Sequence, residues 1–270
     1  MPITRLFPDG RIVRWRRVGG LALAEIEYAA GQRLVPRAGG HWRVVFVLRG
    51  GLLAPDRDGA RPAPASTLIH LPPGAPCDWR AAAGGATCLA IDIDAGWMGR
   101  TGASGLRLAA AEFRGGLLGH LARRLYGEFR LRDEVSRLAI DSLMLGVVAE
   151  AIRRQDRLRA GRQPGWLHRV RELLHARFAE PLTLDEIAAT AGVHRVHLAR
   201  AFREWQSCTI GEYVRNLRLE FVCRELATSS APLAELALAA GFSDQSHCTR
   251  IFKRHLGMTP GRYRRTCATR

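Results

Sequence analysis

The hydrophobic pattern of this chain changes near residue 105, from short apolar stretches to apolar residues at helical spacing. Before that point, short and mostly apolar runs are separated by glycine and proline, which is typical of β-strands. Short strands punctuated in this way predict a small β-barrel or jelly roll over residues 1–105. The predicted strands are 44–48, 67–71 and 88–93, with 11–16 and 21–28 as further candidates.

After residue 105 the pattern predicts two helices and a linker. One helix is expected over 106–129, and a second starts near Asp133 with a stripe of apolar and small residues along one face. This stripe either packs on the barrel or pairs with a second subunit. The Arg, Gly and Pro content of 156–166 predicts a flexible linker after the helical region 106–155. The stripe consists of Val135, Leu138, Ser142, Leu145, Ala149 and Ile152.

Residues 183–263 contain the same pattern twice. Six residues recur 49 positions later, and after one extra residue in the second copy five more recur 50 positions later. Such a duplication indicates two copies of one structural unit. The first six pairs are Leu184/Leu233, Glu186/Glu235, Ile187/Leu236, Ala188/Ala237, Ala191/Ala240 and Gly192/Gly241. The other five are Arg200/Arg250, Phe202/Phe252, Arg203/Lys253, Thr209/Thr259 and Tyr213/Tyr263.

The first copy has the residues that a helix-turn-helix needs. Thr183, followed three residues later by Glu186, fits a capping box at the start of a helix. Gly192 allows the positive φ of a tight turn between two helices. A second helix is then expected from His194 to Trp205, with its apolar residues at helical spacing.

The second copy follows the same pattern with different residues at its ends. Pro232 opens a short helix and Gly241 ends it. Ser243 or Asp244 then caps a helix that runs to about His255. Two helix-turn-helix units in register predict a protein that reads DNA.

The last hundred residues resemble the DNA-binding domain of the AraC/XylS family of bacterial transcription regulators. The stretch 239–264 is close to the signature of that family, and the resemblance covers 167–266. In the family a long helix joins the two units, and 212–227 is the matching segment. The resemblance implies an all-α domain with two helix-turn-helix units, whose second helices enter successive major grooves.

The resemblance also implies which residues face DNA. Arg200 and Arg250 match the arginines that reach base edges, where a guanidinium bonds O6 and N7 of guanine together. The side chains of Val196 and Ala199 carry no donors, so the first unit is expected to read mainly thymine methyl groups and DNA shape. The alternative is that some of these residues contact only phosphate. The candidate set is Arg195, Val196, Ala199, Arg200, Gln245, Ser246, His247, Thr249 and Arg250.

Two positions depart from the family pattern. Cys248 stands where a large apolar side chain is usual, and Ser207 stands where a glycine commonly follows the first reading helix. Cys248 is expected to pack as a small hydrophobic residue, which leaves the second unit less well filled. The six cysteines show neither close pairs nor metal-ligand spacing, so they are expected to be inert thiols.

Net charge favours DNA binding but does not locate it. The chain carries a formal charge of +16 from 41 basic and 25 acidic residues. Residues 1–166 hold 25 basic and 15 acidic residues, a net +10, and 167–270 hold 16 and 10, a net +6. A surface this basic associates with polyanions through counterion release, although its basic excess is not confined to the predicted DNA-binding domain.

The N-terminal barrel resembles, mainly by its position, the cupin-like sensing domain of the same family. We expect its mouth to be lined by His41, Trp42, His70 and Trp79, and a barrel of this size holds one small ligand. The alternative is that these side chains only fill the core. His41 has no second histidine two residues on and no nearby Glu, so no metal, cofactor or catalytic site is expected.

The predicted fold class is therefore α+β with two domains, a cupin-like β-barrel with trailing helices and an all-α DNA-binding domain. The expected function is a regulator that binds promoter DNA, dimerises through 106–155 and responds to a small-molecule effector. Family resemblance favours activation through RNA polymerase over repression. The alternatives are a ligand-independent regulator whose barrel serves only assembly, and a cupin-type enzyme tethered to DNA. The chain has no long apolar span and no signal-peptide pattern, which predicts a cytoplasmic protein without a membrane partner.

Overall fold

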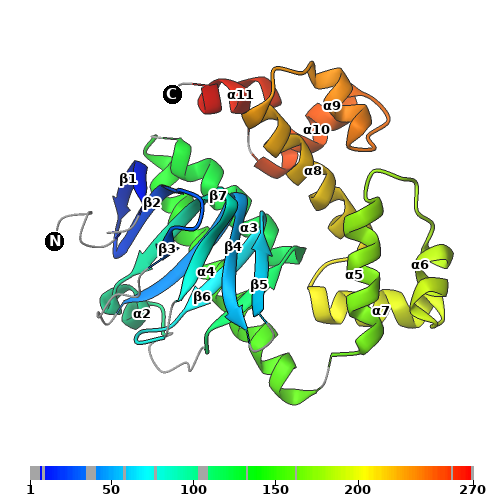
Figure 1. Cartoon of the computed structure of the whole chain (residues 1–270), viewed down its shortest axis with the longest axis horizontal. Coiled ribbons are helices and arrows are strands. Elements are labelled where there is room, and N and C mark those ends of the chain that lie inside the picture. Colours follow the sequence, from blue (N-terminus) through cyan, green and yellow to red (C-terminus); the bar gives the residue numbers. More distant parts are fainter. Residues whose placement is uncertain are drawn as a thin grey trace. The chain divides into compact units, whose positions relative to one another are not determined.

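The computed structural model consists of two compact units (Figure 1). The first contains residues 1–114 and 131–152, and the second contains residues 115–130 and 153–270. Each unit is therefore built from two separate stretches of the chain. The structure describes residues 7, 10–34, 41–56, 59–75, 78–102, 109–131, 133–161, 163–256 and 258–268.

The first unit is built on one antiparallel sheet, and its strands include all five of the predicted stretches. The strands pair in the order β1-β2-β7-β4-β6-β8, while β3 also pairs with β7 and β5 with β4. The bounds are β1 (Arg11–Val18), β2 (Leu21–Tyr28), β3 (Arg33–Leu34), β4 (Trp42–Asp56), β5 (Gly59–Pro64), β6 (Thr67–Leu71), β7 (Trp79–Ile93) and β8 (Ala111–Arg114).

The sheet is not closed, so the predicted cupin-like barrel is corrected to an open sheet. In the described chain, β1 and β8 lie at the two ends of the strand order and do not pair with each other. β8 is only four residues long and is followed by two glycines, Gly115 and Gly116, with φ of 62° and 64°. This left-handed backbone ends the strand, because extended pairing requires negative φ.

β7 occupies the centre of the sheet and explains the mostly apolar run at 88–93, whose one charged residue, Asp92, pairs with Arg43. It pairs with β2 and β4 on its two sides, so that Ile91 lies opposite both Leu23 and Val44. Residues 85–93 are buried throughout, as expected for a strand covered on both faces. One face of the sheet encloses an apolar core that includes Ile26, Val47, Leu52 and Cys88.

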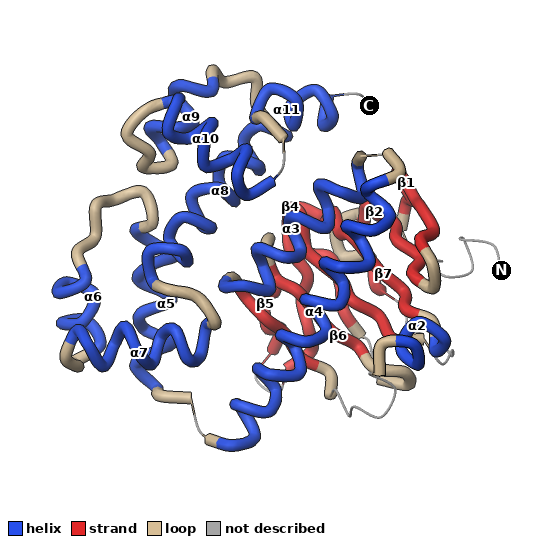
Figure 2. The backbone as a smooth tube through the Cα atoms, turned by 180° about the vertical axis from the view of Figure 1, so that it is seen from behind, coloured by secondary structure: helices blue, strands red, loops and turns tan. Residues whose placement is uncertain are grey.

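Helix α4 (Val135–Ala160) lies across the other face of the sheet (Figure 2). Within this unit, α2 (Ala95–Arg100) contacts α4 because Trp97 Nε1 donates to Asp141 Oδ1 at 3.2 Å. The buried stripe of α4 includes Ile140, Met144, Val147 and Ala151. The stripe that the sequence predicted lies elsewhere on the helix, since Val135, Leu138, Ser142, Leu145 and Ala149 are exposed and Ile152 is half-buried.

The second unit is helical and contains one helix from the N-terminal half of the chain. The helix predicted over 106–129 begins only at Gly116, because 111–114 form β8; Leu106 lies outside the described residues. The predicted linker is helical in its first part, since α4 continues to Ala160. The helices are α3 (Gly116–Arg130), α5 (Gly165–Arg177), α6 (Leu184–Ala191), α7 (Arg195–Gln206), α8 (Ile210–Thr228), α9 (Leu233–Ala239), α10 (Gln245–Leu256) and α11 (Pro260–Ala268).

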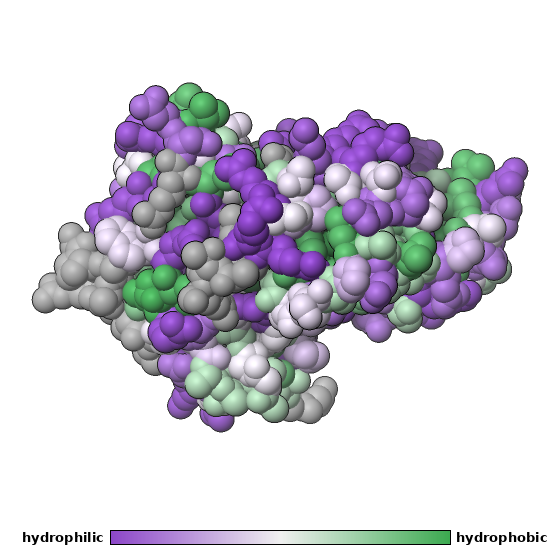
Figure 3. All heavy atoms as spheres, turned by 90° about the horizontal axis from the view of Figure 1, so that it is seen from above, coloured by the Kyte–Doolittle hydropathy of each residue, from purple (hydrophilic) through white to green (hydrophobic). Residues whose placement is uncertain are grey.

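Polar residues cover much of one face of the described chain. In the view of Figure 3, hydrophilic residues cover much of the surface and hydrophobic residues form small separate patches. Of the helices that the structure describes, none combines the length and the apolar composition that a membrane crossing requires.

Candidate nucleic-acid interface

The first helix pair, α6 and α7, has the caps and the turn that its sequence predicts. The Glu186 amide donates to Thr183 Oγ1 at 3.2 Å, and the Thr183 amide donates to Glu186 Oε2 at 2.7 Å, which completes a capping box. These bonds to Thr183 lower the pKa of the Glu186 carboxyl. Gly192 ends α6 with φ 68°. The two helices pack through Ile187, Ala188, Ala191, Leu198 and Phe202, all in one buried cluster.

The second helix pair, α9 and α10, has a similar turn but a different start. Gly241 has φ 81°, while Pro232 precedes α9 and makes no side-chain cap bond. Asp244, rather than Ser243, caps α10, because its Oδ1 accepts from the His247 amide at 2.7 Å. That bond lowers the pKa of the Asp244 carboxyl.

Cys248 and Ser207, the two departures from the family pattern, both have a structural explanation. Cys248 is fully buried on α10, and burial raises the pKa of its thiol to about 11, so it packs as a small hydrophobic residue. Ser207 caps the end of α7 with φ 55°, in the left-handed region where glycine is usual. The predicted apolar packing of Cys248 is confirmed.

Helix α8 joins the two pairs. It begins with a second capping box between Thr209 and Glu212 and contains 19 residues, which gives a length of about 28 Å. Near its start, Tyr213 packs edge-on against Phe202 of α7, with ring centroids 5.3 Å apart. Farther along, Val222 and Leu226 are buried, and Figure 1 shows this end of α8 beside α9 and α11, which it contacts. Each end of α8 therefore contributes to a different helix pair.

The residues predicted to face DNA lie on the first two turns of α7 and α10. Val196 is 65% exposed, and Arg200 and Arg250 are exposed without a hydrogen bond or ion pair to another described residue. Arg195 lies 3.5 Å from Asp185 Oδ2. Arg195, Ala199, Gln245 and Ser246 are also exposed, while His247 and Thr249 are half-buried.

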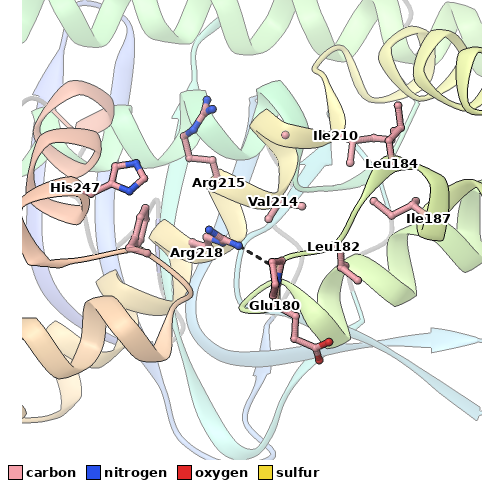
Figure 4. A pocket seen from close by; sticks show the side chains of 12 residues that line it. Glu180, Leu182, Leu184, Ile187, Ile210, Val214, Arg215, Arg218 and His247 are labelled. Carbon is pink, nitrogen blue, oxygen red and sulfur yellow. Dashed lines mark hydrogen bonds between the residues drawn. The ribbon is translucent and has the colours of Figure 1, made fainter.

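His247 is the candidate whose side chain is most engaged within the protein. Its Nδ1 lies 3.0 Å from Ser243 Oγ, and its ring packs edge-on against Phe242 at 5.5 Å between centroids. It also lines a groove of about 390 Å³, together with residues of α6 and α8 (Figure 4). The groove is walled mostly by apolar side chains, among them Leu184, Ile187, Ile210, Val214 and Phe242.

Two arginines of α8 line this groove, and sequence reasoning did not select either. Arg215 forms no hydrogen bond or ion pair with another described residue, whereas Arg218 donates to backbone carbonyls on both sides of the groove. Burial lowers the pKa of the Arg218 guanidinium, and the charge of Arg215 lowers it further. Their signal in the sequence was weak, because two basic residues among apolar ones in a linker helix do not reveal the direction in which they point.

The four residues expected to line a ligand site do not converge. His41 is exposed, and Trp42 stacks on buried His70 with centroids 5.3 Å apart. His70 Nδ1 lies 3.2 Å from the Ala109 carbonyl oxygen, and burial lowers the pKa of His70. Since side chains alternate along a strand, Trp42 and His70 face away from the apolar core to which Trp79 belongs.

The core beside Trp79 leaves little free space. A cavity lined by Tyr28, Arg43, Leu52 and Trp79 measures about 10 Å³, which is the size of a single water molecule. Pockets that hold small-molecule ligands are typically about 300–1,000 Å³. The described residues also contain no group of three or more His, Cys, Asp or Glu that could hold a metal ion.

Comparison with known proteins places this helical region among regulators. A family model described as a helix-turn-helix domain matches residues 187–266. The probable transcription factor PqrA of Proteus vulgaris is 40% identical over 85 residues, which are 32% of this chain and 70% of that protein. The regulatory protein SoxS of Salmonella typhimurium is 35% identical over 85 residues, 32% of this chain and 79% of that protein.

Other similar proteins are longer or differ more in sequence. The right origin-binding protein of Escherichia coli is 37% identical over 93 residues, and the match spans only 32% of its length. A solved transcriptional regulator with an AraC-type DNA-binding domain, from Chromobacterium violaceum, is 33% identical with a TM-score of 0.38 and covers 41% of this chain and 97% of its own. ToxT of Vibrio cholerae covers 96% of this chain and all of its own, at 9% identity and a TM-score of 0.42.

Proposed function

We propose, since the chain belongs to the AraC/XylS family of transcription regulators, that it binds promoter DNA through two helix-turn-helix units. The units are α6–α7 and α9–α10, and α7 and α10 are the reading helices. One observation carries the proposal: both helix pairs have a left-handed glycine turn followed by a helix whose first two turns expose an arginine and other polar side chains. That construction presents the start of the second helix to a major groove.

The length of α8 supports simultaneous reading by both units. Successive major-groove faces on one side of a duplex are about 34 Å apart. A helix of 19 residues spans about 28 Å, so it supplies most of that separation. The two reading helices then contact successive grooves on the same side of the DNA.

The residues divide between base reading and positioning. Arg200 and Arg250 are free of internal partners among the described residues, which suits a guanidinium that bonds the edge of guanine. Val196 offers an apolar surface for thymine methyl groups. Arg195 lies near Asp185 and fits a phosphate contact better than a base contact.

A role in assembly suits the sheet-containing unit better than ligand sensing does. The 10 Å³ cavity beside Trp79 has no room for a metabolite, and this favours a regulator that acts without an effector bound there. The exposed stripe of α4 offers a surface for a second copy of the chain, since Val135 and Leu138 are 69% and 73% exposed. We therefore propose a homodimer formed through α4, with activation through RNA polymerase as the outcome of binding.

The proposed homodimer is tested by measuring the mass of the protein in solution. Leu138→Lys with Leu145→Lys should convert a dimer into a monomer in sedimentation experiments, because two charges would lie in an apolar interface. Arg137→Glu, on the same helix and exposed, is the matched surface change and should leave the dimer intact. Identical masses for the wild type and the double variant would exclude α4 as the interface.

The DNA-binding proposal is tested by genome-wide recovery of DNA crosslinked to the protein. Wild type should give a few sharp promoter peaks that are lost or broadened in Arg200→Ala and in Arg250→Ala. Arg262→Ala removes the same charge from an exposed position on α11 and should keep the peaks. Diffuse recovery in all four proteins would mean that net charge alone governs binding.

A further inference from the structure

The turn of the second helix pair lies directly against the backbone of Ala179, which lies between α5 and α6. A Cβ atom placed on Gly241 would lie 2.8 Å from both the Cα and the carbonyl carbon of Ala179, and closer still to its oxygen. Gly192 occupies the same place in the sequence repeat, yet a Cβ there would meet nothing within 4 Å. Gly241 is therefore needed for a contact between the pairs as well as for its turn.

Arg218 of α8 connects the same two segments by hydrogen bonds. Its Nε donates to the Phe178 carbonyl at 2.9 Å and its Nη2 to the Glu180 carbonyl at 3.2 Å. Its Nη1 donates to the carbonyl of Gly241. Phe178 caps α5 and Glu180 precedes α6, so one guanidinium bonds the entry of the first pair and the turn of the second.

The position of Arg218 in the groove fits this bridging role. Figure 4 shows it on α8 between Glu180, to which it is bonded, and His247 of α10. A guanidinium has five donors in a planar fork, so it can bond three carbonyls in different directions at once. A lysine ammonium at the end of a flexible stem cannot span all three. These groups form a joint between the two pairs. The joint consists of Ala179, Arg218, Gly241 and the carbonyls of Phe178 and Glu180.

We propose that Arg218, through this joint, is a positioning residue that sets the distance and rotation between α7 and α10. Without the joint, the chain would connect the end of the first pair to the start of the second only through α8, with α3 packed beside it, and a single helix bends and twists. With it, the two pairs are connected at a second point. The joint therefore restricts the protein to DNA sites whose two halves have one spacing. This inference rests on the proposed function.

The test is a selection of DNA ligands from a random library, followed by affinity measurements on the selected site with one base pair inserted between its halves. The insertion rotates one half by about 35° relative to the other, so a rigid protein loses the base contacts of one unit. The wild type is expected to lose roughly tenfold or more in affinity. Arg218→Met should still select both half-sites but lose less than about threefold on insertion.

A matched control separates the effect of losing the joint from the effect of losing a positive charge. Arg224→Met removes the same charge from an exposed position on α8, where the guanidinium bonds only Glu225 and lies over Phe221. It should keep the spacing preference of the wild type. Arg218→Lys keeps the positive charge and the aliphatic stem but not the planar fork of donors. It should lose an intermediate amount of affinity on insertion of the base pair. It also provides a second variant if the methionine form does not fold.

The outcomes distinguish the two proposals. If Arg218→Met and Arg218→Lys keep the wild-type loss on insertion, the joint does not set the spacing, and the inference fails while the proposed function stands. If the wild type itself selects a single block of sequence, or none, the reading of two grooves fails, and with it the inference. If the Arg218 variants tolerate the inserted base pair and the wild type and Arg224→Met do not, the inference and the proposed function are both supported.

Discussion

The two helix pairs share a sequence pattern but differ in how the rest of their unit supports them. The first pair has a side-chain capping box and a glycine turn with open space around it. Two arginines of α4 bond its end: Arg154 donates to the Gln206 carbonyl and Arg157 to Ser207 Oγ, both at 2.7 Å. The second begins without a side-chain cap, and its glycine turn lies against Ala179.

Helix α3 supplies a further support to the second pair. His120 and His255 face each other with 3.3 Å between their Nδ1 atoms, and Arg123 forms an ion pair with Glu220 of α8. Residues at equivalent positions of the repeat therefore have different neighbours. A repeated sequence therefore specifies the local turn but not how much each of its residues contributes to stability.

The largest difference is expected at the two turn glycines. Gly192→Ala should cost about 1–2 kcal/mol of stability, since alanine is strained at positive φ. Gly241→Ala should cost about 3–5 kcal/mol, because the same strain is joined by a collision with the backbone of Ala179. Urea unfolding of both variants measures the difference. Equal losses would show that the contact with Ala179 is unimportant for stability.

The next difference is expected in the apolar packing beneath α7 and α10. Leu198 and Cys248 are equivalent in the repeat and both fully buried. Leu198→Ala should cost about 3 kcal/mol and Cys248→Ala about 1 kcal/mol, because leucine leaves the larger cavity. Cys248→Leu tests the same packing by adding side-chain volume. A loss of stability would mean that the core of the second pair is already full, contrary to the expectation that it is less well filled.

Acid should weaken the support that α3 gives to the second pair. Burial, followed by the charges of Arg123, His255 and Arg124, lowers the pKa of His120 to about 4, and Glu212 opposes this shift. The unfolded chain takes up the proton near pH 6.5 and the folded chain only near pH 4, so stability is full above pH 6.5 and falls between these values.

The size of this effect between pH 7 and pH 5 is about 1–2 kcal/mol. Replacement of His120 by Gln should flatten the pH dependence in that range, as measured by chemical unfolding at each pH. His168→Gln changes an exposed histidine of α5 and is the control. A pH dependence that survives in His120→Gln would assign the effect to other groups, of which His255, with a pKa also lowered by burial, is the first to test.

The smallest expected effect concerns the capping box at the start of α6, since α9 of the second pair begins without a side-chain cap bond. Thr183→Ala removes the side-chain acceptor at the start of α6 and should cost about 1 kcal/mol. Thr190→Ala, in the last turn of the same helix, removes only a bond to the Glu186 carbonyl and should cost a few tenths of a kcal/mol. Thermal unfolding that shifts equally in both variants would contradict a special role for the cap.

Features that depend on neighbouring residues could be predicted from the sequence. The capping box at Thr183, the glycine turns at 192 and 241 and the strands at 44–48, 67–71 and 88–93 were all predictable, because φ preferences, capping and side-chain periodicity act within a few residues. The same local signals in the repeat led to the family, which comparison with known proteins confirmed. The predicted base contacts stay predictions.

Features that depend on partners far away in the sequence could not be predicted and required the folded structure. The apolar pattern of α4 contains two stripes, and contact with the sheet selects the one with Ile140 and Met144 rather than the one with Leu138. Whether the sheet closes depends on its end strands, and β1 and β8 do not pair in the described chain. Arg218 meets carbonyls 40, 38 and 23 positions away, and no local pattern specifies partners at such distances, because they are set by how packed helices bring separate segments together.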